Sequence, residues 1–217
     1  GRVLADTLGC KLEALVPGHR LDGMEKELHE YGADVVHLAG DARLAPYRTL
    51  PHTAGVCGVF REEKPQIALF GATSVGRDLG PRVSSALHSG LTADCTSLEI
   101  GGHTEAKTGK EYSDLLYQIR PAFGGNIIAT IVNPECRPQM ATVREGVMKK
   151  EKYGKPTDGA VKKVDVNKYL QPSDLVVRIL ERHMEERKID IKGASVIVAG
   201  GYGVGSKENF ALLYELA

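Results

Sequence analysis

The sequence lacks an excess of charge of either sign, because 28 Lys and Arg residues balance 28 Asp and Glu residues among its 217. No overall field therefore draws the chain to nucleic acid or to an anionic membrane, and we expect neither as a partner. Long hydrophobic runs are lacking too: runs such as 126–132 are far shorter than the roughly 20 residues that span a bilayer. We expect a soluble protein without a membrane span.

Cysteine and histidine are too scattered for a metal site. The four cysteines show no C-x-x-C spacing, which favours a reduced compartment and argues against zinc or iron–sulfur ligation; they are Cys10, Cys57, Cys95 and Cys136. We expect them to be small buried hydrophobic residues. His29-Glu30 is not followed by a second histidine at helical spacing, so the metalloprotease pattern fails. We predict no metal site.

The first 90 residues alternate between helical and strand patterns. This rhythm implies right-handed crossovers and a mostly parallel sheet flanked by helices, so the fold class is α/β. The predicted elements are a helix end with Val3, Leu4 and Leu8 on one face, strands at 11–16, 34–38 and 66–70, and helices at 24–31, 53–60 and from about Arg77.

From residue 92 the pattern changes to closely spaced strands without helices between them. The candidates are 92–100, 115–120, 126–132 and 139–143, with 161–166 as a further strand. We interpret this half as an antiparallel extension of the sheet. The polar stretch 101–114 predicts a long exposed turn, and 148–160 predicts a mobile loop.

The C-terminal part predicts the start of a second domain. Apolar residues from Leu175 to Met184 recur at helical spacing, and the apolar run 195–199 leads into glycines at 200, 201, 203 and 205 and a helix from Glu208. This is the first βα unit of a second doubly wound domain. We expect a first domain at 1–170 whose first strand precedes Gly1, a connector helix at 171–193, and at 194–217 a second domain that continues beyond the sequence.

The turn "GATSVGRDLG", which begins at Gly71, has two interpretations. Ligands bind at the carboxyl ends of parallel strands, so the turn could cradle a phosphate. It could equally be an ordinary βα turn that Thr73 or Ser74 caps. The second interpretation is favoured because the P-loop lysine and a full phosphate fingerprint are both lacking.

Two long blocks carry a family resemblance. "GATSVGRDLGPRVSSALHSGLTADCTSLEI" (71–100) and "QIRPAFGGNIIATIVNPECRPQMATVREGVM" (118–148) resemble the N-terminal domain of the alpha subunit of electron transfer flavoproteins. The closing "VIVAGGYGVGSKENFALLYELA" (196–217) is similar to the opening of that family's FAD domain. The resemblance implies an electron carrier that is not a catalyst by itself, with FAD held mainly by residues beyond 217.

The same resemblance implies the partners. The alpha subunit pairs with a beta subunit, and its FAD accepts electrons from an acyl-CoA dehydrogenase-type flavoenzyme. The beta subunit holds AMP or, in electron-bifurcating relatives, a second FAD, and these relatives split NADH electrons between two acceptors, one of them ferredoxin. Both variants stay open. The resemblance and the cysteines favour a bacterial cytoplasm, with the mitochondrial matrix as the alternative.

Near the flavin, the resemblance implicates the glycine loop. Gly201, Gly203 and Ser206 match loop residues beside the cofactor. Tyr202 stands where the family typically has an arginine against FAD. A phenol cannot replace the charge or the five-donor fork of a guanidinium, although it can stack or donate one hydrogen bond.

In the first domain the resemblance implicates "RPAFGGN". Pro121 and the two following glycines favour a tight bend that presents Arg120 and Asn126. The family places this bend toward the beta subunit and, in bifurcating members, toward its flavin. Arg137 and Arg144 flank the next strand and are further interface candidates. The alternative for Arg120 is a surface ion pair worth little energy.

Two other functions remain open. A nucleotide-binding regulatory or ligase-like α/β domain would use the turn after Gly71 for a phosphate. A scaffold domain would dock the beta subunit without a cofactor of its own.

Overall fold

The computed structural model describes residues 1–154, 159–183, 191 and 194–217. These residues form two compact units, 1–178 and 179–217, which are considered separately. None of the helices in the described ranges has the length and apolar character needed to cross a membrane.

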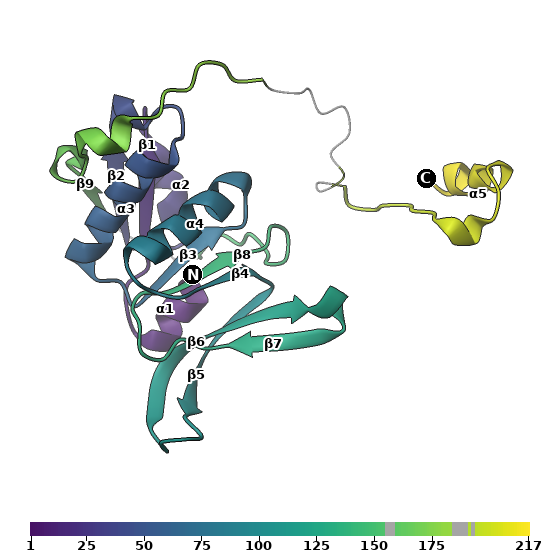
Figure 1. Cartoon of the computed structure of the whole chain (residues 1–217), viewed down its shortest axis with the longest axis horizontal. Helices are drawn as coiled ribbons and strands as arrows, with labels where there is room; N and C mark the ends of the chain where they lie inside the picture. Colours follow the sequence, from purple (N-terminus) through teal and green to yellow (C-terminus); the bar gives the residue numbers. More distant parts are fainter. Residues whose placement is uncertain (155–158, 184–190, 192–193) are drawn as a thin grey trace. The chain divides into compact units, whose positions relative to one another are not determined.

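The first unit alternates strands and helices and then adds a hairpin region (Figure 1). Here η marks a 3₁₀-helix. In chain order the elements are α1 (Arg2–Leu8), β1 (Glu13–Gly18), α2 (Met24–Glu30), β2 (Val35–Gly40), η1 (Ala42–Leu44), α3 (Thr49–Glu63), β3 (Ile67–Gly71), α4 (Ser74–Ala86), β4 (Leu91–Cys95), β5 (Ser97–Thr104), β6 (Glu111–Ala122), η2 (Phe123–Gly125), β7 (Ile127–Ile131), β8 (Gln139–Val143), β9 (Ala160–Lys163), η3 (Val166–Lys168) and η4 (Pro172–Leu175).

Two parallel sheets and one antiparallel sheet confirm the α/β class. One parallel sheet has the order β1-β2-β9, the other has the order β3-β8-β4, and the antiparallel sheet has the order β5-β6-β7. The helices α3 and α4 pack against each other beside the parallel sheets (Figure 1). Their side chains form one core with Ala68 of β3 and Met140 of β8.

The prediction from the sequence assigned two strands to the wrong sheet. It grouped 139–143 and 161–166 with the antiparallel half, but β8 and β9 lie in the parallel sheets. Residues Gln139 to Thr142 of β8 are all buried, as a central parallel strand requires. Chain proximity suggested the antiparallel strands as partners, whereas burial on both faces selects the parallel sheet for β8. β9 is exposed throughout and lies at the edge of its sheet beside β2.

The stretch 92–100 is two strands rather than one. β4 pairs with β8 in parallel, and β5 pairs with β6 in antiparallel. Asp94 has the left-handed φ of +63°, and the register shifts between Thr92 and Cys95. This bulge redirects the chain from one sheet to the other.

The antiparallel sheet forms two hairpins that extend from the parallel sheets (Figure 1). β5 and β6 are longer than expected, so the predicted long turn is reduced to 105–110. At the other hairpin, Gly124 and Gly125 have φ values of +68° and +93°, which glycine adopts readily. The tight bend expected at "RPAFGGN" is therefore confirmed.

The cysteines differ from the expectation in part. All four are free. Cys57 and Cys95 are buried as predicted, but Cys10 is exposed and Cys136 is half-buried. Cys10 follows the glycine that ends α1, in a connection that the short helix leaves at the surface.

The second unit does not contain the elements expected around its start. The prediction of a connector helix is wrong over 176–183, because these residues are non-helical after η4. Met184 lies outside the described residues. Val176 and Leu180 are exposed, so the apolar stripe has no packing surface that would stabilise a helix. The prediction of a strand at 195–199 is also wrong. Among the described residues no strand pairs with this segment, and Val196 and Ile197 are exposed. The unit contains η5 (Tyr202–Val204), η6 (Glu208–Phe210) and α5 (Ala211–Leu216).

Candidate functional site

The turn between β3 and α4 is a capped helix start. The Gly76 backbone N–H donates to Thr73 Oγ1 at 3.1 Å, so the predicted cap by Thr73 is confirmed. A Cβ atom at Gly76 would lie 1.8 Å from the Gly71 carbonyl oxygen. Gly76 is thus needed for close packing of the turn, and the glycines of this segment give no separate argument for a phosphate site.

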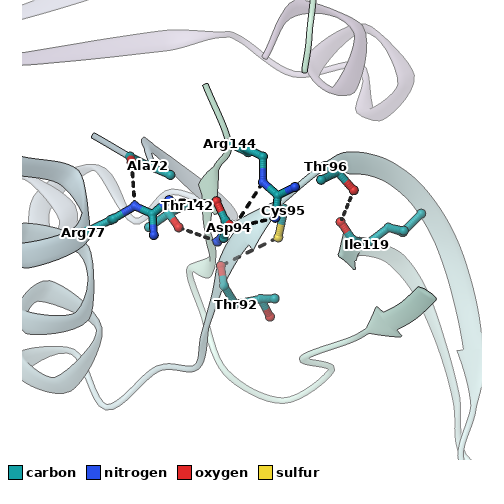
Figure 2. Close-up of polar contacts among 9 residues, drawn as sticks. All are labelled: Ala72, Arg77, Thr92, Asp94, Cys95, Thr96, Ile119, Thr142 and Arg144. Atoms are coloured by element: carbon teal, nitrogen blue, oxygen red, sulfur yellow. Dashed lines mark hydrogen bonds and ion pairs between the residues drawn. The ribbon is translucent and has the colours of Figure 1, made fainter. Parts of the chain in front are cut away.

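Asp94 lies between two arginines at the carboxyl ends of β3, β8 and β4 (Figure 2). Its Oδ1 is 3.0 Å from Arg77 Nη2, and its Oδ2 accepts from Arg144 Nη2 at 2.7 Å and from Arg144 Nε at 3.1 Å. The Asp94 backbone N–H donates to Thr142 Oγ1 at 2.7 Å. Side chains from α4 and from the end of β8 therefore fix the carboxylate, and Thr142 of β8 fixes the backbone of Asp94.

The charges around Asp94 do not balance. The hydrogen bond from Arg144 lowers the pKa of Asp94 despite partial burial, and the positive charges of Arg77 and Arg120 add to this effect. The same bond raises the pKa of Arg144. We call Arg77, Asp94, Arg120 and Arg144 the Asp94 cluster. Three guanidinium groups and one carboxylate leave it net positive, so it attracts an anionic group.

Arg120 also begins a projecting apolar arm. It lies on β6 opposite Ala129 of β7, and it is half-buried. We call residues 120–131 the β6–β7 arm. Four large apolar side chains of the arm are exposed: Phe123 by 81%, Ile127 by 53%, Ile128 by 72% and Ile131 by 38%. Asn126 is exposed at the end of the bend.

The predicted interface residues lie in three different places in the structure. Arg144 binds Asp94, the positive charge of Arg120 acts on the same carboxylate from further away, and Asn126 lies on the arm. Arg137 is apart: its Nη1 donates to carbonyl oxygens of its own loop, at 3.3 Å to Asn133, 3.1 Å to Pro134 and 2.9 Å to Cys136. Sequence reasoning missed Arg77 and Asp94 as members of the cluster. An acid at the end of a buried strand, in "TADC", was the available signal.

The glycine loop of the second unit is open on one side. Its backbone forms tight turns, with Val204 N–H donating to Gly201 O at 3.0 Å and Gly205 N–H to Tyr202 O at 3.1 Å. A Cβ at Gly200 would collide with Leu213, whereas Cβ atoms at Gly201 and Gly203 would meet nothing within 4 Å. Gly201, Tyr202, Gly203 and Ser206 are all exposed.

This loop partly fits a flavin nucleotide. The open glycine positions allow close approach of a ligand to the backbone. Residues 200–206 contain no cationic side chain, and the phenol of Tyr202 stands free. The Ser206 hydroxyl donates to Glu208 and lowers the pKa of that carboxyl. The loop can therefore offer backbone, hydroxyl and aromatic contacts to FAD, but no charge.

A second charged group lies on the other parallel sheet. His37 is buried, its Nε2 is 2.6 Å from Glu13 Oε2, and its Nδ1 is 3.9 Å from Glu63 Oε1. These three could hold a metal by their proximity. However, the two carboxylates face opposite ring nitrogens, and Glu63 already binds Lys162 Nζ at 2.8 Å. We interpret the group as an ion-pair network that ties β1, β2, α3 and β9.

Comparison with known proteins gives consistent matches. Residues 1–169 match the family model described as the electron transfer flavoprotein domain. The whole chain is 51% identical to a protein FixB of Clostridium saccharobutylicum and 45% identical to an electron transfer flavoprotein subunit alpha of Clostridium acetobutylicum. It is 40% identical to an acryloyl-CoA reductase electron transfer subunit beta of Anaerotignum propionicum. The chain covers 61%, 62% and 64% of these relatives, respectively.

Proposed function

Because this chain belongs to the electron transfer flavoprotein family, we propose that it forms part of the alpha subunit of a flavin-dependent electron carrier. The main observation behind this proposal is the match over the whole chain to a relative named as that subunit. The chain spans about three-fifths of the length of such relatives, so the function of the whole protein is an inference.

We assign 1–170 to the N-terminal domain, 171–193 to a connector and 194–217 to the FAD domain. In this arrangement FAD belongs to the second domain, to which 194–217 contribute the glycine loop. FAD supplies the electron-transfer chemistry, and the protein's part is to position and tune it. Gly201 and Gly203 allow close approach, Ser206 offers a hydroxyl, and Tyr202 offers its ring in place of an arginine.

The β6–β7 arm is the proposed docking surface for the beta subunit. Phe123 and the isoleucines of β7 are large exposed apolar side chains, with Ile127 and Ile131 on one face of the strand and Ile128 on the other, and such exposure is typical of a protein interface. β7 is an edge strand, so its outer backbone groups can pair with a partner strand. Arg120 and Arg144 add positive charge near the base of the arm, where they would orient an acidic partner surface or a second flavin.

The electron donor is proposed to be an acyl-CoA dehydrogenase-type flavoenzyme. A relative named as an electron transfer subunit of acryloyl-CoA reductase supports this class of partner. The relatives named above come from bacteria, so we place the complex in a bacterial cytoplasm. Electron bifurcation with NADH and ferredoxin is the alternative to a simple carrier.

The test is the flavin content of the native complex purified through this subunit. One flavin per heterodimer that an acyl-CoA dehydrogenase reduces would support the carrier. Two flavins, with NADH-dependent reduction of ferredoxin, would extend the proposal to bifurcation. A full-length heterodimer without flavin would overturn electron transfer and leave the scaffold function. A melting-temperature increase with ATP but not with FAD would instead favour the nucleotide-binding function.

A further inference from the structure

A pocket of about 360 Å³ opens between α3 and α4, which pack side by side in the first unit (Figure 1). One face of α3 lines it from Leu50 to Arg61, the last turn of α4 adds Arg82 and Ser85, and η4 adds Asp174. Pockets for organic ligands measure roughly 300–1,000 Å³, so this one has room for a small molecule. We call it the α3–α4 pocket.

The charges on the pocket wall favour an anion. Arg61 and Arg82 contribute one positive charge each from different helices, and Asp174 is the single acid among the described lining residues. The Oδ2 atom of Asp174 already accepts the Gln171 backbone N–H at 2.8 Å, in the cap of η4. Two cations and one anion leave the wall net positive, so it attracts an anionic group.

Neither arginine of the pocket is neutralised. Arg82 makes no hydrogen bond or ion pair within the described residues. Arg61 makes one long bond, from Nη2 to the Ala86 carbonyl oxygen at 3.4 Å, and no ion pair in the same ranges. A guanidinium has five N–H donors, so most of them are available to a ligand. The positive charge of Arg61 also opposes the burial that raises the pKa of the Cys57 thiol, so this charge acts on the pocket wall.

A buried hydroxyl on the same wall lacks a partner. Thr53 is only 7% exposed, and its Oγ1 has no hydrogen-bond partner within the described residues. An unsatisfied buried hydroxyl costs free energy, and such groups normally have a protein or water partner. Threonine in a helix has two accessible χ1 rotamers, so this hydroxyl can reorient toward an acceptor that enters the pocket.

We propose that the α3–α4 pocket binds a small phosphate monoester, with the phosphate between Arg61 and Arg82 and within reach of the Thr53 hydroxyl. Guanidinium groups bind phosphate oxygens through paired, charge-assisted hydrogen bonds. The apolar part of the wall, at Leu50, would cover the organic part of the ester, which a free phosphate ion lacks. No aromatic side chain lines the described wall, so a stacked nucleotide base is not expected.

The pocket is separate from the sites described above. None of its lining residues belongs to the turn after Gly71, to the Asp94 cluster or to the glycine loop. The inference is therefore independent of electron transfer, and a phosphate bound at the turn after Gly71 would not respond to a change at Arg82.

The test is calorimetric titration of the native complex with glycerol 3-phosphate at constant ionic strength, with inorganic phosphate and glycerol as comparison probes. We expect glycerol 3-phosphate to bind more tightly than phosphate, and glycerol not to bind. Arg82→Gln should weaken binding at least about tenfold, because charge-assisted bonds to the phosphate are lost. This variant should fold, since Arg82 has no other partner among the described residues. Arg20→Gln is the matched control, because Arg20 is exposed, has no ion pair within the described ranges and does not line the pocket.

Thr53→Val separates a ligand contact from a structural role. It removes the hydroxyl with little change of shape, so it should weaken binding about threefold to tenfold and leave the free protein at least as stable as the parent. A lower melting temperature with unchanged binding would show a structural hydroxyl and would contradict the proposed contact.

Three other results would overturn the proposal. Equal affinity of the parent and the Arg82→Gln complexes would place the phosphate elsewhere. Equal affinity for glycerol 3-phosphate and inorganic phosphate would show a surface that attracts anions without a pocket for the ester. Equal weakening by Arg20→Gln and Arg82→Gln would show a general effect of net charge.

Discussion

The Leu116 backbone N–H of β6 donates to Gln139 Oε1 of β8 at 2.8 Å, and both residues are completely buried. This side chain joins the antiparallel sheet to a parallel sheet, where no backbone ladder connects the two strands. A buried backbone donor without an acceptor costs far more than an exposed one. Gln139 therefore links the two halves of the first unit, beside the apolar contacts among Cys95, Leu116 and Ala141.

Replacing Gln139 by methionine keeps much of the side-chain volume and removes the acceptor. We expect Gln139→Met to lower the free energy of unfolding by about 1–3 kcal/mol in urea titrations. Gln66→Met is the control: Gln66 Nε2 donates at 2.9 Å to the exposed Asp114 carbonyl, which water can satisfy instead. Equal losses in the two variants would contradict the special role of Gln139.

Gly76→Ala should be strongly destabilising because the added Cβ meets the Gly71 backbone, which cannot move aside cheaply. We expect a loss of about 2–3 kcal/mol in the free energy of unfolding. Gly55→Ala, in the middle of α3 with nothing within 4 Å of the new Cβ, should stabilise by about 0.5–1 kcal/mol. Loss of stability in the second variant as well would show that the space around these glycines is not as described.

Asp94→Asn should change the dependence of stability on pH. The pKa of Asp94 is lowered in the folded state, so its contribution is fully present above the ordinary carboxyl pKa near 4 and is lost as the pH falls through the folded value. We expect the variant to be about 1–2 kcal/mol less stable at pH 7. The difference from the parent should shrink below about pH 4.

Urea unfolding at a series of pH values measures this difference. Asp22→Asn is the control, because Asp22 is exposed and has no ion pair within the described residues. A constant difference between Asp94→Asn and the parent across the acid range would contradict the proposed role of the arginines.

The β6–β7 arm can be tested by placing a charge at its most exposed isoleucine. Ile128→Asp should weaken binding to the beta subunit at least tenfold, because the carboxylate would be desolvated in the interface. Val3→Asp is a matched control, since Val3 is 77% exposed and lies on α1, outside the arm. Binding by calorimetry or interferometry that is weakened equally by both changes would exclude the arm as the docking surface.

Tyr202→Arg should raise the reduction potential of the proposed alpha-subunit flavin, measured in the native complex. A nearby guanidinium stabilises the anionic reduced flavin, and each 1.4 kcal/mol corresponds to about 30 mV for a two-electron couple. Spectroelectrochemical titration checks this, with Tyr202→Gln as a neutral control. An unchanged potential in Tyr202→Arg would show that residue 202 does not face the flavin.

Local patterns predicted most of the first unit. The alternation of strands and helices through residue 90 and the bend at "RPAFGGN" depend on periodicity and glycine, which are visible in the sequence. The order of strands in a sheet cannot be read from local patterns. β8 lies between β3 and β4 and is buried on both faces, and this burial becomes visible only when the helices are assembled around the sheet.

Single residues of the candidate site could be predicted from the sequence, but their grouping around Asp94 could not. Arg120 and Arg144 were named separately, but 24 positions separate them, and no local signal indicates that the charges of both act on Asp94. Arg137 has the same sequence character and satisfies carbonyl groups of its own loop instead. The prediction of a strand at 195–199 was wrong for a different reason. A strand requires a neighbouring strand, and none is described there.

The exposed isoleucines of β7 also bear on how such a protein is made. An uncovered apolar edge strand is a template for aggregation, because any other extended chain can pair with it. If the arm is covered only in the heterodimer, the two subunits must be synthesised in matched amounts, and any excess of this one would be lost to proteolysis or inclusion bodies. Balanced co-expression would then determine the yield of soluble protein.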